Sequence, residues 1–286
     1  MRINKENLTI IIVTIKSYKI IDKCLNSIDP DIKKIIVENS SNLNFINDLK
    51  NRYKNLEGYT TNDNLGMGKA NNFGISKSTT RYVMILNPDT ILDQNAMKNI
   101  YEISENLNFA ILSPLSENIK FPNYKIKNEN IYYENGLIEV DQVDGYSMIL
   151  DKQKFNKKFF DEKIFMYLEN DDLCLRAKNN NEKIFIYSKS LIKHSGANTV
   201  DQKYSNELEL SRNWHWKWSK FYFKKKHYGF MSAFASSFHK PIKSIFKSIY
   251  FFLTFRPYKS KVYLNRALGF VNALLGKKSS YRPRLD

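Results

Sequence analysis

The chain has 286 residues, of which 42% are hydrophobic and 14% are aromatic. This length and composition suffice for a buried core, so they exclude an intrinsically disordered chain. The formal net charge of +16 is unevenly distributed, because residues 212–286 hold 17 Lys and Arg and a single acid, Asp286. The first 211 residues therefore carry no net charge, and we expect two regions of different character.

The two cysteines and the apolar runs bear on the compartment. Cys24 and Cys174 lie in apolar stretches without a CxxC spacing, so we predict reduced core residues and a reducing compartment. No run reaches the roughly 18 apolar residues needed to span a bilayer, and residues 8–13 are too short for a secretory leader. We expect a cytoplasmic protein, peripheral on the inner face of the cytoplasmic membrane.

The first 105 residues alternate between apolar β-branched runs and stretches with helical spacing of apolar residues. This alternation is typical of a parallel α/β sheet, and open parallel sheets bind ligands at the carboxyl ends of their strands. We therefore expect a nucleotide-binding domain. The expected strands lie within 8–13, 33–41 and 81–90, and the expected helices within 17–28, 45–56, 68–78 and 93–105.

After residue 106 the pattern loosens into short strands and loops over 111–133, a strand entering a turn over 141–155, and a strand ending at His194. Residues 212–286 then interleave Trp, Phe and Tyr with Lys, which is typical of basic amphipathic helices lying in a membrane interface. We predict an α/β domain over 1–211 and a basic, aromatic-rich helical region over 212–286.

Two short motifs carry groups suited to binding a nucleotide. VENSS places Glu38 just past the second strand, where a carboxylate can accept hydrogen bonds from a base or a ribose. NLGMGKANNFG combines glycines, which let a phosphate or sugar approach the backbone, with asparagines that both donate and accept hydrogen bonds. An ordinary capped turn and a helix start with Asn caps are the respective alternatives.

A third motif, LNPDT, ends the next strand with oxygen ligands at Asn87 and Asp89. Residues i and i+2 of an extended segment point the same way, so the pair could hold Mg²⁺ or Mn²⁺ together with a substrate diphosphate. A Pro-Asp turn leading into a helix is the alternative. His194 either has a structural role or completes the coordination of a metal at Asp89.

The strongest motif is MYLENDDLCLRA, which crowds Glu169, Asp171 and Asp172 between apolar residues. If a helix begins near Asp171, then Asp172 and Arg176 form an i, i+4 pair on one face. Helix capping explains Asp172 but not the other two acids, because adjacent carboxylates repel and raise each other's pKa. The motif therefore predicts a general base at the start of this helix.

Taken in order, seven motifs resemble the family 2 glycosyltransferases of the GT-A fold, especially their bacterial rhamnosyltransferase-like branch. The resemblance covers roughly residues 8–226. It implies an α/β fold with a mostly parallel central sheet flanked by helices and a Rossmann-like nucleotide-binding half. The composition of residues 212–286 adds a basic C-terminal helical extension to this fold. The motifs are VTIKSY, VENSS, NLGMGKANNFG, LNPD, DGYSMIL, FMYLENDDLCLRA and KHSG.

The resemblance also implies roles for single residues. Thr14 and Glu38 would contact the nucleobase, although the family usually has Asp at the second position. Asn87 and Asp89 match the family's DxD element, so Asp89 would be the main ligand of a divalent ion. Gly145 would lie on the acceptor side. The other residues lining the donor would be Asn64, Gly66 and Asn72.

One position departs from the family pattern. MYLENDDLCLRA resembles the family's E-D-x-D-L-C-x-R segment, whose first Asp is expected to be the catalytic base. Here that position is Asn170, which cannot accept a proton in this way. Asp171 or Glu169 must then substitute, or the enzyme is weakened.

Together these features imply an inverting, metal-dependent glycosyltransferase. It would move rhamnose or another hexose from a dTDP- or UDP-sugar to a hydroxyl of a cell-surface or lipid-linked glycan. A carboxylate of Glu169, Asp171 or Asp172 would be the base, and Mg²⁺ or Mn²⁺ at Asp89, with His194, would neutralise the leaving group.

The basic C-terminal region would bind an anionic membrane surface, and no nucleic acid is expected. Two alternatives remain open. The first is a non-catalytic sugar-nucleotide-binding relative, which Asn170 suggests. The second is a nucleic-acid-binding protein that uses the basic, aromatic tail.

Overall fold

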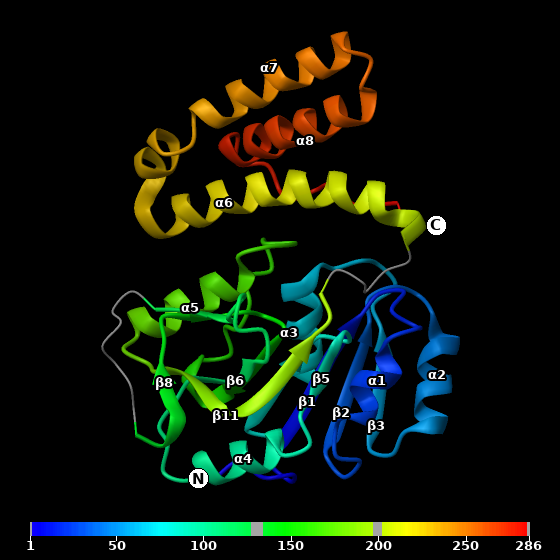
Figure 1. Cartoon of the computed structure of the whole chain (residues 1–286), viewed down its shortest axis with the longest axis vertical. Helices are drawn as coiled ribbons and strands as arrows, with labels where there is room; N and C mark the ends of the chain where they lie inside the picture. The colour runs from blue at the N-terminus through cyan, green and yellow to red at the C-terminus, as the bar shows by residue number, and fades with distance from the viewer. Residues whose placement is uncertain (1, 127–133, 197–201, 285–286) are drawn as a thin grey trace. The chain divides into compact units, whose positions relative to one another are not determined.

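The computed structural model describes residues 2–126, 134–196 and 202–284. It divides into two compact units: residues 1–161 with 170–200 form unit 1, and residues 162–169 with 201–286 form unit 2 (Figure 1). This division differs from the predicted boundary after residue 211, which falls inside helix α6 (Ser205–Ala235). The charge changes partway along this helix, but the helix packs as a whole with unit 2. Part of the stretch expected to form short strands, 127–133, lies outside the described residues.

The first half of the unit 1 sheet is parallel. Its strands run in the order β3-β2-β1-β4, and each neighbouring pair is parallel, as the alternation of strands and helices predicts. One of these strands was not expected, because its sequence LEGYT offers only a weak apolar run and buries only Gly58. The bounds are β1 (Leu8–Thr14), β2 (Lys33–Glu38), β3 (Leu56–Thr60) and β4 (Tyr82–Leu86).

The second half of the sheet is mixed. Strand β10 lies antiparallel between β4 and β6, whereas β11 pairs in parallel with β6 and antiparallel with β5 and β8. Strand β11 ends at His194, as predicted, and β7 and β9 form a separate small sheet. The bounds are β5 (Thr90–Leu92), β6 (Ile111–Ser116), β7 (Tyr124–Lys125), β8 (Leu137–Glu139), β9 (Gln142–Val143), β10 (Ser147–Asp151) and β11 (Ile184–His194).

Five helices accompany the described strands of unit 1, and four of them overlap the expected helices with ends that differ by a few residues. Helix α2 begins at Leu43, two residues before the expected start, because the Asn42 side chain accepts a hydrogen bond from the Phe45 N–H. The bounds are α1 (Ile21–Asn26), α2 (Leu43–Arg52), α3 (Met67–Lys77), α4 (Ala96–Ile103) and α5 (Glu169–Asn179), with short 3₁₀ turns η1 (Glu134–Gly136) and η2 (Lys152–Lys154).

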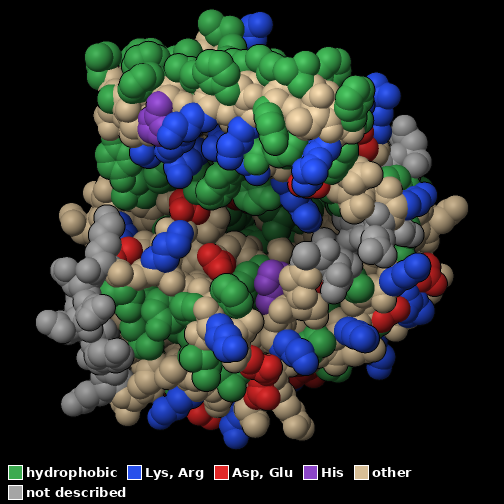
Figure 2. Space-filling model, turned by 45° about the horizontal axis from the view of Figure 1, so that its top comes forward, with side chains coloured by type: hydrophobic (Ala, Val, Ile, Leu, Met, Phe, Trp, Pro, Cys, Tyr) green, Lys and Arg blue, Asp and Glu red, His purple; other side chains and the backbone are tan. Residues whose placement is uncertain are grey.

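Unit 2 is built from α6, α7 (His239–Leu253) and α8 (Pro257–Leu274), preceded by the 3₁₀ turn η3 (Gln202–Tyr204). Helices α6 and α8 approach so closely that a Cβ at Gly269 would lie 2.1 Å from the Trp214 carbonyl oxygen. Figure 2 shows hydrophobic side chains gathered in a band over the helices at the top of the view, with Lys and Arg beside them. Among the helices that the structure describes, none is both long enough and apolar enough to cross a membrane.

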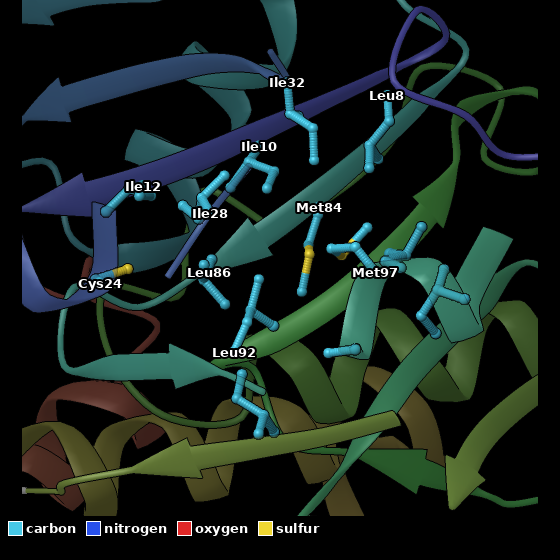
Figure 3. Close-up of a cluster of buried hydrophobic side chains, with 14 of the residues drawn as sticks. Leu8, Ile10, Ile12, Cys24, Ile28, Ile32, Met84, Leu86, Leu92 and Met97 are labelled. Carbon is cyan, nitrogen blue, oxygen red and sulfur yellow. The ribbon is translucent and has the colours of Figure 1, made fainter. Parts of the chain in front are cut away.

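Unit 1 has an apolar core on each face of its sheet. Successive strand residues point to opposite faces, so Ile10 and Ile12 of β1 enter one cluster while Ile11 and Val13 enter the other. In the first cluster Ile10 lies near Met84 on the neighbouring strand, and Ile12 lies beside Cys24 at the edge of the cluster (Figure 3). Both cysteines are buried and free, as predicted. The packed sheet fixes the strand ends that carry the polar motifs.

Candidate active site

Polar side chains end three adjacent strands of the parallel half-sheet. Thr14 is the last residue of β1, Glu38 is the last residue of β2, and Asn87 and Asp89 follow β4. All four bury a side-chain oxygen that has no hydrogen-bond partner within the described part of the chain: Thr14 Oγ1, Glu38 Oε2, Asn87 Oδ1 and Asp89 Oδ1. Buried polar atoms are normally paired, so such a group of unpaired atoms marks a place where a ligand could supply the partners.

Glu38 is held in one orientation at this edge. Its Oε1 accepts a hydrogen bond from Ser40 Oγ at 2.5 Å, and the Lys16 backbone also interacts with the carboxyl group. Oε2 has no partner in the described ranges. Burial raises the pKa of this carboxyl to about 7, and the Ser40 and Lys16 hydrogen bonds only partly oppose the increase. A bound hydrogen-bond donor would stabilise the ionised form.

The loop before α3 is shaped by asparagines. Asn64 Oδ1 accepts from the Gly66 N–H at 3.1 Å and from Asn39 Nδ2 at 3.1 Å, while Asn39 Oδ1 accepts from the Leu65 N–H. Gly66 precedes α3 with φ of 79°, a conformation that favours glycine. Asn64 and Gly66 therefore fix the loop backbone. Asn39 was missed as a member of this network, although it lies in VENSS.

Asn72, which was predicted to line the donor, contacts the backbone of Phe160. Its amide nitrogen donates to the Phe160 carbonyl at 2.8 Å, and its amide oxygen accepts from the Phe160 N–H at 2.9 Å. Both ends of the amide are used to hold the loop at Phe160. The neighbouring Asn71 is 1% exposed, and its Oδ1 has no partner among the described residues.

The structure brings together the two residues predicted as metal ligands. His194 Nε2 lies 3.3 Å from Asp89 Oδ2, and the His194 ring stacks on Tyr146 with centroids 4.1 Å apart. The backbone supports the pair, because the Ser195 N–H donates to the Asp89 carbonyl. The described residues contain no group of three or more His, Cys, Asp or Glu side chains suited to a metal. A divalent ion here would need a substrate to complete its coordination.

The donor set fits that kind of ion. Mg²⁺ is usually held by one or two carboxylates together with substrate phosphates and water. Asp89 Oδ1 and Asn87 Oδ1 are buried oxygens without partners in the described ranges, and they lie two residues apart after β4. The residues present are therefore compatible with a divalent ion bridged to a diphosphate.

Helix α5 carries the acidic motif and begins at Glu169, two residues earlier than expected. Asp172 is fully buried, and its Oδ2 accepts from Arg176 Nε at 2.9 Å, which is the predicted i, i+4 pair. Arg176 also donates to the Lys158 and Phe159 carbonyls. Because Asp172 is enclosed and its carboxylate is engaged, we assign it to the anchoring of α5 and not to catalysis.

Asn170, at the position where the resemblance implies the catalytic base, joins α5 to strand β9. Its side-chain nitrogen donates to the Val143 carbonyl at 2.9 Å. A Cβ on Gly145 would lie 3.3 Å from Asn170 Cβ, so the glycine allows this close contact. Gly145 was predicted on the acceptor side, and the structure places it against Asn170.

Asp171 is the motif carboxylate in unit 1 that remains partly open, with a side chain 17% exposed. Burial raises its pKa, whereas Lys125, whose Nζ lies 3.9 Å from Asp171 Oδ1, and a hydrogen bond with Gln142 act in the opposite direction. The elevated pKa makes this carboxylate a stronger proton acceptor than an exposed one.

Asp144 is a second carboxyl in this neighbourhood, and sequence reasoning missed it. Burial raises its pKa, the nearby charge of Asp171 raises it further, and Lys125 and His194 lower it. Asp144 therefore lies close enough to Asp171 and to His194 to interact with the charges of both. Its place immediately before Gly145 in DGYSM was the available signal.

Glu169 is the first residue of α5 but is grouped with unit 2. The two residues before it, Tyr167 and Leu168, have φ values of 70° and 69°, in the left-handed region that non-glycine residues rarely adopt. Consecutive residues of this kind are strained and are enriched at functional sites. The start of α5 is therefore a locally strained turn.

The chain is similar to known proteins in sequence and in fold. The model of glycosyl transferase family 2 matches residues 9–196. A curated relative, the low-salt glycan biosynthesis hexosyltransferase Agl10 of Haloferax volcanii, is 26% identical over 200 residues. That alignment covers 63% of this chain and 64% of the relative, so the chain spans just under two thirds of its length.

Two solved structures are similar in fold. A crystal structure of GalNAc-T7 with UDP, GalNAc and Mn²⁺ has a TM-score of 0.54 at 10% identity and covers 73% of this chain and 51% of that chain. A crystal structure of S. aureus TarS 1-349 has a TM-score of 0.52 at 13% identity and covers 95% of this chain and 92% of that chain. At these identities the likeness concerns the fold alone, and the predicted GT-A fold is confirmed. Because the family model matches well over half of its residues, the chain belongs to glycosyl transferase family 2.

Proposed function

We propose that the protein is an inverting glycosyltransferase that moves a hexose, such as rhamnose, from a UDP- or dTDP-sugar to a glycan hydroxyl. The observation that carries this proposal is the set of four unpartnered buried oxygens at adjacent strand ends. A nucleotide-sugar with its cation could satisfy all four oxygens. The curated relative is named a hexosyltransferase of glycan biosynthesis, which supports a hexose donor and a glycan acceptor.

The nucleobase would bind between the ends of β1 and β2. Glu38 Oε2 could accept a hydrogen bond from the base while Ser40 holds Oε1. Uracil and thymine both present an N–H donor between two carbonyl groups, so both bases suit a carboxylate acceptor. Thr14 Oγ1 could either donate to a base carbonyl or accept from the ribose. This geometry supports a UDP or dTDP donor.

The diphosphate would lie beside Asp89. We assign Asp89 and His194, with help from Asn87, as the residues that would hold Mg²⁺ or Mn²⁺. When bound, such an ion would neutralise the diphosphate of the leaving group. GalNAc-T7 was crystallised with UDP and Mn²⁺, which supports a divalent ion in this fold.

Asp171 would be the general base. The acceptor hydroxyl gives its proton to an Asp171 carboxylate oxygen as the hydroxyl oxygen bonds to the anomeric carbon. The bond from that carbon to the diphosphate breaks in the same step, and the nucleoside diphosphate leaves with the electron pair. Because only ionised Asp171 can accept the proton, the rate should increase with pH through its raised pKa. Glu169, at the start of α5, remains a second proposed base.

The Asn170 contact bears on the alternative of a non-catalytic relative. Asn170 donates to the Val143 carbonyl, which an ionised Asp could not do. This position therefore holds α5 against the end of β9, and the neighbouring Asp171 would be the proton acceptor. The amide supports a relocated base more than a lost activity.

Hydrolysis of nucleotide-sugars tests the proposal without the natural acceptor, because water can take its place. Purified protein is given UDP- and dTDP-hexoses with Mn²⁺, and release of nucleoside diphosphate is measured. We expect turnover that Asp89→Ala lowers by about 100-fold or more, since it removes stabilisation of the leaving group. Asp93→Asn is the matched control, because this exposed acid lies outside the site and its amide can still accept from the Asn95 N–H.

Two results would contradict the proposal. One is that the unaltered protein shows neither turnover nor nucleotide binding, as measured by calorimetry, with any donor of the panel. The other is turnover by Asp89→Ala equal to that of Asp93→Asn.

A further inference from the structure

Helix α7 has its apolar side chains on the outside. The residues that it buries are Pro241, Ser244 and Ser248, which recur at helical spacing. Its large apolar side chains recur at spacings of three and four residues beside that buried stripe and are 44–69% exposed. We call this set the outer face of α7: Ile242, Ile245, Phe246, Ile249, Phe252 and Leu253.

The inner face of α7 is fixed by polar contacts with α8. Ser248 Oγ donates to the Ser260 carbonyl at 2.9 Å, and Ser260 Oγ donates to the Ser248 carbonyl at 2.8 Å. Ser244 is buried on the same side and donates to the Lys240 carbonyl one turn earlier. Small side chains let two helices approach closely, so these serines determine which face of α7 packs against α8. Rotating the helix to bury its isoleucines would break the reciprocal bonds.

The apolar surface continues along the chain on both sides of α7. Phe230, Phe234 and Phe238 form a stacked ladder that leads into the helix, with successive ring centroids 6.0 and 5.7 Å apart. Phe255, just beyond the helix, is 94% exposed. Contiguous exposed apolar surface of this kind on a folded protein marks an interaction site.

Positive charge borders the outer face. Lys240, Lys243 and Lys247 recur along one side of α7 between the outer and inner faces, and Lys259 and Lys261 follow at the start of α8. Residues 212–286 contain 17 basic side chains and one acid, Asp286. A second copy of such a strongly basic surface would be repelled, whereas an anionic surface would be attracted.

We propose that the outer face of α7 inserts into the interfacial region of a bilayer that contains anionic lipid, with the bordering lysines at the headgroups. A helix with a Phe- and Ile-rich face and Lys along its border is suited to lie in the plane of such an interface. The lysines carry their ammonium groups on long apolar stems, which can reach the phosphates while the face is buried. This proposal does not depend on the transfer reaction, because it uses contacts within unit 2 alone.

Vesicle flotation with the full chain tests the proposal in the absence of any sugar nucleotide. The probes are vesicles of phosphatidylcholine alone and of phosphatidylcholine mixed with phosphatidylglycerol. We expect binding to the mixed vesicles that weakens with salt. Phe246→Ser combined with Ile249→Ser should lower the partition coefficient by about tenfold or more, since it removes two inserted apolar side chains.

A matched control exists in unit 1. Ile119→Ser combined with Phe121→Ser makes the same two changes at residues that are 92% and 75% exposed, and it should leave vesicle binding unchanged. Lys243→Glu combined with Lys247→Glu should lower binding to the mixed vesicles and reduce its salt dependence. Circular dichroism verifies that each variant is folded.

Three outcomes would overturn the proposal. The first is failure of the unaltered chain to float with mixed vesicles. The second is equal flotation by the α7 variant and the unit 1 control. The third is sedimentation of the unaltered chain as an oligomer that the α7 variant dissociates, without vesicle binding, since the outer face would then be an interface between copies.

Discussion

The two units place polar and apolar groups in opposite ways. Unit 1 buries isoleucine, valine and phenylalanine on both faces of its sheet and leaves buried oxygens without partners at one edge. Unit 2 has a small aromatic core around Trp214 and Phe270, yet α7 buries serines and exposes isoleucine and phenylalanine. Buried oxygens without partners in unit 1 and exposed apolar side chains in unit 2 both make folding less favourable. In each unit these are the groups that we assign to binding a ligand or a membrane.

The largest loss of stability should result from removing a buried aromatic ring in unit 1. Phe185 in β11 is 2% exposed, so Phe185→Ala removes a large apolar side chain and leaves a cavity. We expect a loss of about 3–5 kcal/mol in the free energy of unfolding. Urea unfolding followed by hydrogen exchange in β6 and β11 measures it, and a loss below about 1 kcal/mol would mean that this core is poorly packed.

Glu38→Gln should stabilise the ligand-free protein while weakening nucleotide binding. Because burial raises the carboxyl pKa from 4.5 to about 7, ionising Glu38 in the folded state costs up to about 3 kcal/mol. The folded state binds the proton more tightly than the unfolded state, so the cost is absent below the unfolded pKa and complete above the folded one. The gain in melting temperature should therefore be large at pH 8 and vanish near pH 4.

The same prediction has a direct control. Glu57→Gln changes a carboxyl whose pKa is lowered by Lys33, so it should give no gain in stability at pH 8. An equal gain from both variants would show that net charge, and not burial of Glu38, is responsible.

Gly269→Ala should destabilise unit 2 by about 1–3 kcal/mol, because the added Cβ would overlap the Trp214 carbonyl oxygen and force α6 and α8 apart. Tryptophan fluorescence reports this unit selectively, since all three tryptophans lie in α6. Leu268→Ala, at an exposed neighbouring position, is the control and should change stability by less than about 0.5 kcal/mol. Equal effects would contradict the close helix contact.

The smallest change in stability is expected for an exposed aromatic ring of α7 in unit 2. Phe246→Ala removes the same ring as Phe185→Ala, but Phe246 is 68% exposed. Its free energy of unfolding in solution should change by less than about 0.5 kcal/mol. A loss as large as that of Phe185→Ala would show that the outer face of α7 is packed and would remove the contrast between the units.

Much of the fold could be predicted from local pattern. The β-branched runs of β1, β2 and β4 and the apolar spacing of α2 and α3 were sufficient for a parallel α/β sheet. Strand β3 could not be predicted, because LEGYT has little apolar content and is stabilised by pairing with β2. The division of the chain into two units could not be predicted either, since residues 162–169 pack with unit 2 through contacts distant in sequence. One of them is the hydrogen bond that Ser219 Oγ donates to the Met166 carbonyl.

The candidate site was predictable only in part. Strand-end position indicated Glu38, Asn87, Asp89 and His194, and the structure places the last two within 3.3 Å of each other. Spacing could not show that Asn72 is engaged by the Phe160 backbone or that Asp172 is enclosed with Arg176. Asp144 was missed because its relation to Asp171 depends on how the β9–β10 loop meets α5.

The central claim is that Asp171 removes the acceptor proton in a donor site at the strand ends. Its most direct test is to measure nucleotide-sugar affinity by calorimetry and single-turnover transfer for the unaltered chain and for Asp171→Asn. For Asp171→Asn we predict an unchanged nucleotide-sugar affinity and a single-turnover rate that is lower by about 100-fold or more, because the amide cannot take the proton. Equal single-turnover rates for the two proteins would contradict the account.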